Sequence, residues 1–342
     1  MVIISVTFTD ERVVIMPGFV THYIFGIEAY HNLKSNTKKE TYTLKKIISA
    51  NRSVFSLGLQ GPDLFFYYLP SYILEGHNLG AIAHTTRTGI FFEGLLKGTL
   101  SFHDPYDRAI AESYLCGFIG HYTLDTICHP YIYGMTHYDK TDRAYFSRHA
   151  YLETDIDTAL LHKKLHRTPC TFHAADTLAL SAHQKKVVAR LLYFAYRYTY
   201  PELRIYKNTM RLAIFSLQLG LCLLHDDSGK KKALVRLTER YCLGYPLFSP
   251  LFPSDTLFFR TDPFNLQRKS WQNPWDHSIT SNETFFDLYD KAMPLYLSRL
   301  RHLSPLLHVA PDDPHYHELF ETCLKEYGNL SFHSGLDSTI PS

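Results

Sequence analysis

The chain has 342 residues, of which 45% are hydrophobic and 20% charged, a composition typical of a soluble globular protein with a large buried core. The 35 basic residues nearly balance the 33 acidic ones, and the longest basic run is three lysines at 230–232, so the charge pattern disfavours a stable nucleic-acid partner. The 20 histidines are many beside 35 lysines and arginines, which indicates a use for imidazole.

Helical periodicity, interrupted by glycine and proline, runs through most of the chain, and period-two alternation is scarce. The pattern predicts an all-α protein whose many helices form a single domain. Residues 1–15 are expected to be a strand or a flexible extension, and residues 244–281, rich in proline and aromatic side chains, a long packed loop. The predicted helices cover residues 17–32, 39–57, 62–68, 79–97, 105–127, 147–162, 178–198, 202–224 and 282–300.

Cysteine usage and the absence of a leader predict a cytoplasmic location. The six cysteines are widely spaced and include no CxxC pair, which is typical of free thiols in a reducing compartment. Asp10, Glu11 and Arg12 interrupt the apolar run that a signal peptide would need. The apolar segment at residues 212–224 is shorter than the roughly 20 residues that cross a membrane, so we expect no transmembrane segment.

The predicted helix over residues 105–127 leads into the segment GHYTLDTICHP, in which His121, Asp125 and His129 follow one another at intervals of four. Residues four apart lie on one face of a helix, so His121 and Asp125 have the spacing of metal ligands. His129 precedes Pro130, which favours an extended backbone, so we expect His129 to leave the helix and turn toward a neighbouring position. One row of side chains could therefore supply two metal ions.

A second pair of the same spacing, His149 and Glu153, follows on the helix predicted over residues 147–162, with Asp157 one turn further. Imidazole and carboxylate are ligands that suit zinc. Such pairs also occur on solvated helix faces. Two of them together, the first within an apolar helix whose buried polar groups need partners, favour a metal site.

Three further candidates lie upstream: His22 in an apolar segment, Asp63 after a Gly-Pro turn, and His84 on an apolar helix. A lone histidine is more often a hydrogen-bonded core residue than a ligand. The complete series, however, resembles the zinc-dependent phospholipase C superfamily, whose other branch contains zinc-dependent single-strand nucleases. The resemblance covers roughly residues 16–165 and consists, in chain order, of His22, Asp63, His84, His121, Asp125, His129, His149 and Glu153.

The resemblance implies an all-helical phosphoesterase with a buried trinuclear-type centre that holds two to three zinc ions. The first two zincs would share a bridging water, and the third would be more exposed. Residues 16–165 would form the catalytic core, and residues 166–342 a helical part packed on it. The implied ligands are Asp63, His84 and His121 for the first zinc, His22 and Asp125 for the second, and His129, His149 and Glu153 for the third.

Two features depart from the family pattern. The family usually places five residues between the aspartate and the next histidine, whereas Asp125 and His129 are separated by three, so Cys128 is an alternative ligand. Secreted members bind one zinc through a free terminal amine. Translation from Met16 with removal of the methionine would make Pro17 the terminus and leave residues 1–15 untranslated. The alternative is that residues 1–15 are genuine and that one zinc is weak or absent.

Such a centre activates water to attack phosphorus, and Asp63 is the candidate to orient or deprotonate that water. The near-neutral charge and the aromatic residues around Trp271 and Trp275 favour an amphiphilic phosphodiester, so we expect a phospholipase C-like hydrolase whose phosphoester substrate is a phospholipid. Two alternatives stay open. One is a zinc-dependent nuclease or nucleotide phosphoesterase, which would need a basic channel with stacking aromatics. The other is a non-catalytic binding module in which zinc only stabilises the fold.

Overall fold

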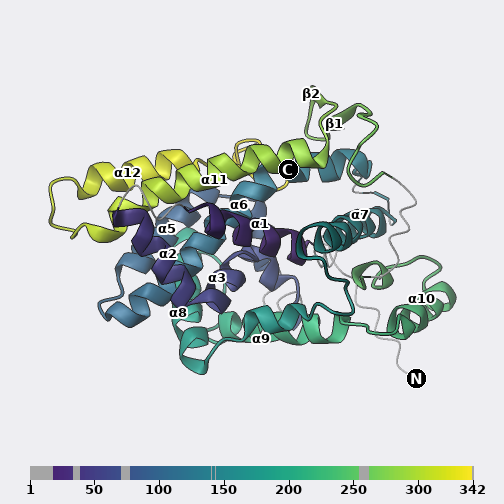
Figure 1. Ribbon diagram of the computed structural model, residues 1–342, viewed down its shortest axis with the longest axis horizontal. Helices are drawn as coiled ribbons and strands as arrows, with labels where there is room; N and C mark the ends of the chain where they lie inside the picture. Colours follow the sequence, from purple (N-terminus) through teal and green to yellow (C-terminus); the bar gives the residue numbers. More distant parts are fainter. Residues whose placement is uncertain are drawn as a thin grey trace.

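The computed structural model describes residues 18–33, 39–70, 78–139, 141–142, 144–253 and 262–340. Helices dominate these residues, which confirms the predicted helical class (Figure 1). The predictions for residues 1–15 and for a start at Met16 or Pro17 lie outside the described residues. Among the described residues, no helix combines the length and the hydropathy that a membrane crossing requires.

Helix α6 (Pro105–Met135) is the longest described helix, and nearly all of its side chains from Ile110 to Tyr133 are buried. The Asp104 carboxylate caps it by accepting hydrogen bonds from the backbone N–H groups of Tyr106 and Asp107. Pro105 occupies the first turn, where a helix makes no use of the N–H that proline lacks. This cap starts the helix that later presents His121, Asp125 and His129.

Helix α3 (Arg52–Gly58) packs against α6 with the two backbones in contact. A Cβ added at Gly58 would lie 2.2 Å from the carbonyl oxygen of Tyr114, and one at Gly117 would lie 2.2 Å from that of Phe55. Only glycine permits this approach. It brings the turn that follows α3, which carries Asp63, next to the histidine face of α6.

The other elements surround this pair. Figure 1 shows α11 and α12 side by side along one edge of the molecule and α9 along the opposite edge. The hydrophobic core is continuous from Phe25 in α1 to Phe332 near the C-terminal end. The bounds of these other helices and strands are α1 (Phe19–Asn32), α2 (Lys39–Ala50), η1 (Gly61–Phe65), α4 (Leu79–Thr85), α5 (Thr88–Leu100), α7 (Tyr145–Leu160), η3 (Leu161–Leu165), η4 (Ala174–Leu178), α8 (Ala182–Thr199), α9 (Thr209–Leu224), α10 (Lys230–Cys242), η5 (Ser249–Leu251), β1 (Trp271–Asn273), β2 (Asp276–Ser281), α11 (Phe285–His308) and α12 (Tyr316–Tyr327).

Several predicted helices are divided or displaced. The predicted helix at 39–57 breaks at Asn51 into α2 and α3, and the one at 79–97 breaks at Arg87, whose φ of 52° ends a right-handed helix. The segment predicted as a helix at 62–68 is the short 3-10 helix η1. Helices α10 and α12 and the antiparallel pair β1–β2 were not predicted.

The prediction that His129 leaves the helix is wrong, because α6 continues through Pro130 to Met135. Pro130 removes one backbone hydrogen bond. The next residues, Tyr131, Ile132 and Tyr133, are each no more than 5% exposed, and burying them as a helical face outweighs that loss. His129 therefore stands in line with Asp125, one turn further along the same helix.

The aromatic segment at 244–281 packs as predicted in its described parts. Trp271 on β1 is 7% exposed, and its indole N–H donates to the carbonyl oxygen of Glu283. Strand β1 lies against the end of α6, since a Cβ at Gly134 would be 2.6 Å from the carbonyl oxygen of Gln272. The segment thus closes one end of the central helix.

Candidate metal centre

All eight predicted ligands lie together in the interior, and none is more than 6% exposed. Five of them, here called the inner cluster, come from α1, η1, α4 and α6, and three, here called the outer triad, from α6 and α7. The inner cluster is His22, Asp63, His84, His121 and Asp125, and the outer triad is His129, His149 and Glu153.

Asp125 and Asp63 hold the inner cluster together. The two oxygens of Asp125 lie 3.1 Å from His22 Nε2 and 2.9 Å from His121 Nε2. Oδ1 of Asp63 lies 3.0 Å from His84 Nε2 and 3.9 Å from His121 Nε2. Asp125 Oδ2 is also 3.9 Å from His84 Nε2, so the five side chains face one small space.

The outer triad is simpler. The two oxygens of Glu153 each lie 3.2 Å from an imidazole Nε2, one of His129 and one of His149. Asp125 Oδ2 lies 3.6 Å from His129 Nδ1, which links the triad to the inner cluster through α6.

The ligand atoms form three groups in which all members lie within 4.8 Å of one another. The outer triad is the set predicted for the third zinc. The other two groups share His121 and mix the sets predicted for the first and second zincs, so the assignment of ligands to those two ions stays a prediction. The three groups are His22, Asp63 and His121; His84, His121 and Asp125; and His129, His149 and Glu153.

Hydrogen bonds to Nδ1 fix the orientation of four imidazole rings. His84 Nδ1 lies 2.7 Å from the carbonyl oxygen of Gly80, and His121 Nδ1 lies 3.1 Å from that of Leu59. His129 Nδ1 lies 3.1 Å from the carbonyl oxygen of Phe332, and His149 Nδ1 lies 2.8 Å from the Tyr145 hydroxyl. A carbonyl requires Nδ1 to carry the proton, which leaves Nε2 with a free lone pair, as in a metal-binding histidine.

The free lone pairs of His84, His121 and His149 face carboxylate oxygens, which are also acceptors, so neither side can satisfy the other. His129 differs, because its Nε2 is hydrogen-bonded to Glu153 Oε1 at 3.2 Å. Six buried atoms consequently lack a hydrogen bond within the described part of the chain: the Nε2 atoms of His84, His121 and His149, Asp63 Oδ1, Asp125 Oδ2 and Glu153 Oε2. Imidazole nitrogens and carboxylate oxygens that converge on a shared space are the donor set that zinc takes. The residues present therefore fit zinc.

The charges in the centre favour a cation. Burial raises the pKa of the Asp125 carboxyl, but the facing imidazoles of His121 and His129 hold it well below its usual value. Burial also raises the pKa of the Glu153 carboxyl, but the facing imidazoles of His149 and His129 outweigh burial and lower it. Burial lowers the pKa of His129, yet Asp125 and Glu153 raise it to about 9. Both carboxyl groups are thus held as anions in an interior that needs positive charge.

Gly61 allows Asp63 and His121 to meet. Its φ is +47°, and a Cβ at this position would lie 2.1 Å from His121 Cδ2. Gly61 begins η1, and Pro62 follows in its first turn, just before Asp63. The Gly-Pro-Asp sequence therefore makes a tight turn directly beneath a ligand ring.

Asp157, one turn beyond Glu153, caps a helix. Its carboxylate accepts hydrogen bonds from the backbone N–H groups of Gly18, Val20 and Thr21 at 3.2, 3.1 and 2.8 Å, and from the Thr21 hydroxyl at 2.6 Å. These bonds fix the start of α1, which carries His22, onto α7. A carboxylate at a helix N-terminus supplies acceptors for N–H groups that have no helical partner.

Cys128, the alternative ligand, belongs to the hydrophobic core and to none of the three ligand groups among the described residues. Burial, with a smaller contribution from Asp125, holds the pKa of its thiol well above the usual value. The geometry therefore does not favour Cys128 as a ligand in place of His129.

One residue of the centre was missed by sequence reasoning. His333 follows Phe332, and its ring centroid lies 5.3 Å from that of His84 and 6.2 Å from that of His129. Burial and the neighbouring histidines hold its pKa well below the usual value. A lone histidine 180 residues beyond Glu153, with no periodic partner, carries no signal that would have identified it.

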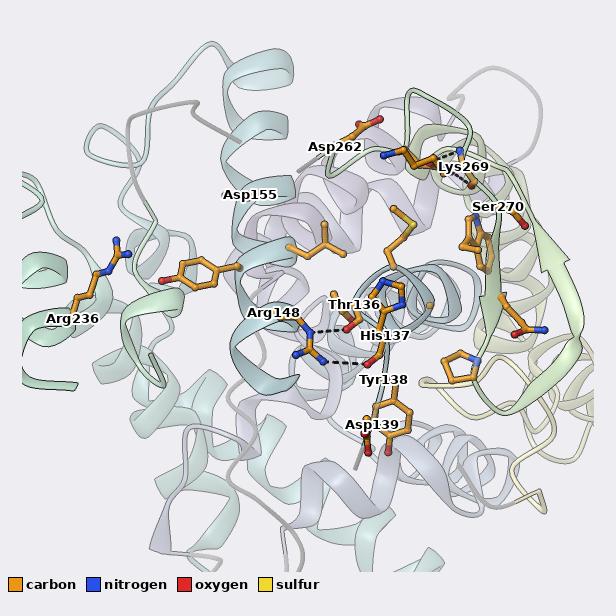
Figure 2. A pocket seen from close by; sticks show the side chains of 18 of the residues that line it. Thr136, His137, Tyr138, Asp139, Arg148, Asp155, Arg236, Asp262, Lys269 and Ser270 are labelled. Carbon is orange, nitrogen blue, oxygen red and sulfur yellow. Dashed lines mark hydrogen bonds between the residues drawn. The ribbon is translucent and has the colours of Figure 1, made fainter. Parts of the chain in front are cut away.

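A large cavity of about 1770 Å³ lies beside α7, but none of the eight predicted ligands lines it. Arg148 and Asp155 of α7 face this cavity, whereas His149 and Glu153 point into the metal centre. Figure 2 shows Arg148 donating to the carbonyl oxygens of Thr136 and His137 at the end of α6. Helix α7 therefore separates the cavity from the outer triad.

Residues 21–207, more than half of the chain, match the model of a protein family described as zinc dependent phospholipase C. The matched segment contains all eight predicted ligands and ends well before Phe332 and His333. No curated protein and no solved structure matches the chain.

Proposed function

Because the chain belongs to the zinc-dependent phospholipase C family and is therefore a phosphoric ester hydrolase, we propose that its metal centre cleaves the phosphodiester of a phospholipid and releases the phosphorylated headgroup. The observation that carries the proposal is the set of six buried nitrogen and oxygen atoms that converge without hydrogen-bond partners among the described residues. The proposal includes a cytoplasmic location, for which the free cysteines are the support.

The inner cluster and the outer triad would together hold two to three zinc ions. Zinc bound there would supply Lewis acidity, making water acidic enough to attack phosphorus near neutral pH and offsetting charge on the phosphoryl oxygens. The chain's own contribution is to orient four of the five imidazoles through Nδ1 and to keep the carboxylates of Asp125 and Glu153 ionised. A centre whose ligands are oriented beforehand loses little energy to reorganisation during the reaction.

Asp63 is the residue to which we assign the handling of the attacking water. Its Oδ1 is buried beside His84 and His121 and lacks a hydrogen bond among the described residues. A carboxylate in that position can orient the water or take its proton. Asp63→Asn keeps the size and one oxygen of the side chain, so we expect an intact fold, most of the zinc, and phosphodiester turnover reduced on the order of 10²-fold or more.

Turnover of bis(p-nitrophenyl) phosphate by the wild type and by Asp63→Asn, with zinc measured in both, tests this assignment. Unchanged turnover would remove Asp63 from the mechanism. The substrate proposal is tested by comparing phosphatidylcholine with single-stranded DNA under the same conditions. Preference for DNA would replace the lipid proposal with a nuclease that uses the same centre, and hydrolysis of neither phosphodiester would leave only a metal-stabilised binding module.

A further inference from the structure

A loop over residues 329–338, here called the C-terminal loop, closes over the metal centre. It is fixed from both sides. The Asn329 side-chain oxygen accepts hydrogen bonds from the backbone N–H of Gly89 at 3.0 Å and from the Ser338 hydroxyl at 2.7 Å. The Asn273 amide donates to the carbonyl oxygen of Ser334 at 2.8 Å. The loop is therefore a built part of the site.

The loop also touches α6 where that helix lacks a backbone hydrogen bond. A Cβ at Gly335, whose φ is +66°, would lie 2.5 Å from the carbonyl oxygen of Thr126. The helical partner of that carbonyl is Pro130, which has no N–H to donate. Gly335 thus allows the loop to pack at the turn that carries Asp125 and His129.

Phe332 joins the inner cluster to the outer triad. Its N–H donates to the carbonyl oxygen of His84 at 2.8 Å, and its own carbonyl oxygen accepts from His129 Nδ1 at 3.1 Å. One residue of the loop therefore positions a ligand in each half of the centre, and this places the next side chain, His333, between the two.

His333 lies beside the centre and carries an unused nitrogen. Its Nε2 is buried and lacks a hydrogen bond among the described residues, while other atoms of the residue reach solvent. Its ring packs 5.3 Å from that of Tyr133, a neighbour of His149. His333 belongs to none of the three ligand groups within the described part of the chain, so its role differs from theirs.

We propose that His333 is a substrate-contacting residue whose Nε2–H donates a hydrogen bond to a phosphoryl oxygen of the bound phosphoester. The proposal rests on the phosphodiesterase function proposed above. A buried polar atom that borders solvent and lacks a protein partner is satisfied when a ligand enters. The residue lies outside the family match at 21–207, so the match by itself assigns it no role.

His333→Ala, His333→Asn and the exposed control His315→Ala test the proposal. For each, we would measure kcat/KM on bis(p-nitrophenyl) phosphate, zinc content, and the affinity for inorganic phosphate by calorimetry. For His333→Ala we expect full zinc content, with kcat/KM and phosphate affinity both lower on the order of 10- to 100-fold, as for one hydrogen bond to a charged group. Because its amide can donate, His333→Asn should recover part of both, and His315→Ala should match the wild type.

Loss of a zinc from folded His333→Asn would overturn the proposal, since it would make His333 a ligand. Unchanged kcat/KM and phosphate affinity in His333→Asn and His333→Ala would overturn it as well. The phosphate arm is independent of turnover. If the wild type cleaves no phosphodiester but His333→Ala still weakens phosphate binding, the proposed function fails and the contact stands.

A separate observation concerns the outer surface of α9 and α10. Along α10, Leu234, Leu237 and Tyr241 are 66%, 52% and 81% exposed and lie three to four residues apart, on one face. Along α9, the exposed stripe is Leu212, Phe215, Leu219 and Leu223, each at least 45% exposed. Each helix thus exposes a row of large apolar side chains, and exposed apolar surfaces of this kind mark interaction sites.

The charge on α10 indicates the partner. Helix α10 carries five cations and one carboxylate. Lys230 and Lys231 are exposed at its start, whereas Lys232, Arg236 and Arg240 line the cavity beside α7. That carboxylate, Glu239, is buried and accepts hydrogen bonds from the backbone N–H groups of Leu247 and Ser249 at 3.0 and 3.1 Å, so it does not neutralise the surface. An exposed apolar stripe that begins with lysines fits a helix that lies in the surface of an anionic bilayer.

We infer that α9 and α10 dock on anionic phospholipid membranes, which would bring the enzyme to the lipid substrate proposed above. The experiment is cosedimentation of the full chain with vesicles of phosphatidylcholine alone or mixed with phosphatidylglycerol. The test variant is Leu234→Ser/Leu237→Ser. The matched control is Leu266→Ser, which alters a leucine of 65% exposure outside both helices.

The wild type should bind the mixed vesicles more tightly than the neutral ones and less tightly at high salt. The double variant should lose on the order of 10-fold or more in vesicle affinity, with turnover of bis(p-nitrophenyl) phosphate unchanged. Wild-type protein that hydrolyses this soluble substrate but binds no vesicles would overturn docking and leave the function standing. A wild-type dimer that the double variant converts to monomer, with equal vesicle binding, would assign the surface to a second copy instead.

Discussion

The inner cluster and the outer triad use the same ligand types but are supported by different parts of the chain. Of the inner rings, His84 is oriented by the carbonyl oxygen of Gly80, four residues earlier, and His121 by that of Leu59, 62 residues earlier. The outer rings depend on the Tyr145 hydroxyl and on Phe332, 203 residues after His129. Each region thus has one ring oriented by a residue four positions away, but only the outer triad has a ring, that of His129, whose orientation depends on the C-terminal loop.

Removal of all metal should have the largest effect, because it affects both regions. We expect at least two zinc ions per chain in protein purified without chelator. Chelation should abolish phosphodiester turnover and lower the melting temperature, since a ligand present at 1,000 times its Kd contributes about 4 kcal/mol to folding. Elemental analysis followed by calorimetry checks both. Fewer than one zinc per chain would contradict the metal centre as a whole.

Single ligand removals should separate the two regions. His149→Ala leaves the outer triad with two protein ligands, so we expect one zinc to be released and the inner zinc to remain. His121 belongs to both inner groups, so His121→Ala should release more zinc than His149→Ala. Zinc counts on the two folded variants measure the difference. Full metal content in His149→Ala would show that His149 and Glu153 form no metal site.

A substitution beneath the inner cluster should disturb that region alone. Gly61→Ala places a Cβ against His121 and also forces an alanine into a backbone conformation with positive φ. Gly229→Ala is the control, because it has the backbone strain of a φ of +70° but its Cβ would meet no atom within 4 Å. We expect Gly61→Ala to lower the free energy of unfolding by about 1–3 kcal/mol more than the control. Inner zinc should be lost more readily than outer zinc. Denaturant unfolding and zinc counts test this, and equal effects of the two variants would contradict it.

The smallest effect is expected from the phenol that orients His149. Tyr145→Phe removes the hydroxyl 2.8 Å from His149 Nδ1 and keeps the ring. Loss of a partner of this kind lowers metal affinity by about 10-fold or somewhat more. Tyr138→Phe is the control, because it removes a hydroxyl from a neighbouring ring, whose centroid lies 5.0 Å from that of Tyr145. Chelator competition should show weaker binding of one zinc only in Tyr145→Phe, and identical curves would mean that the hydroxyl does not orient the ligand.

Much of the fold could be predicted because most helices bury one apolar face, which leaves a period in the sequence. Helix α10 escaped because its apolar residues point outward and only Glu239 is buried. The break at Arg87 and the passage of α6 through Pro130 were also missed. In both cases tertiary packing overrides the local backbone preference. The packing partners lie far along the chain, so a short stretch of sequence does not reveal them.

The candidate ligands were identifiable because four of the eight occur as pairs spaced by four residues, and the order of the series matches a known family. Their convergence within 4.8 Å in three groups agrees with that identification, while the role of each residue stays a prediction. The C-terminal loop was not identifiable. Phe332 acts through its backbone, which no residue type reveals, and His333 has no partner within one helical turn.

The hydrogen bond between His129 and Phe332 has a consequence for the order in which the protein is made. The two residues are 203 positions apart, and ribosomes add roughly 5–20 residues per second. His129 therefore emerges roughly 10–40 s before the carbonyl oxygen that orients it has been synthesised. During that interval the ring of His129 lacks the partner of its Nδ1, whereas the carbonyl oxygens that orient the rings of His84 and His121 have already been synthesised.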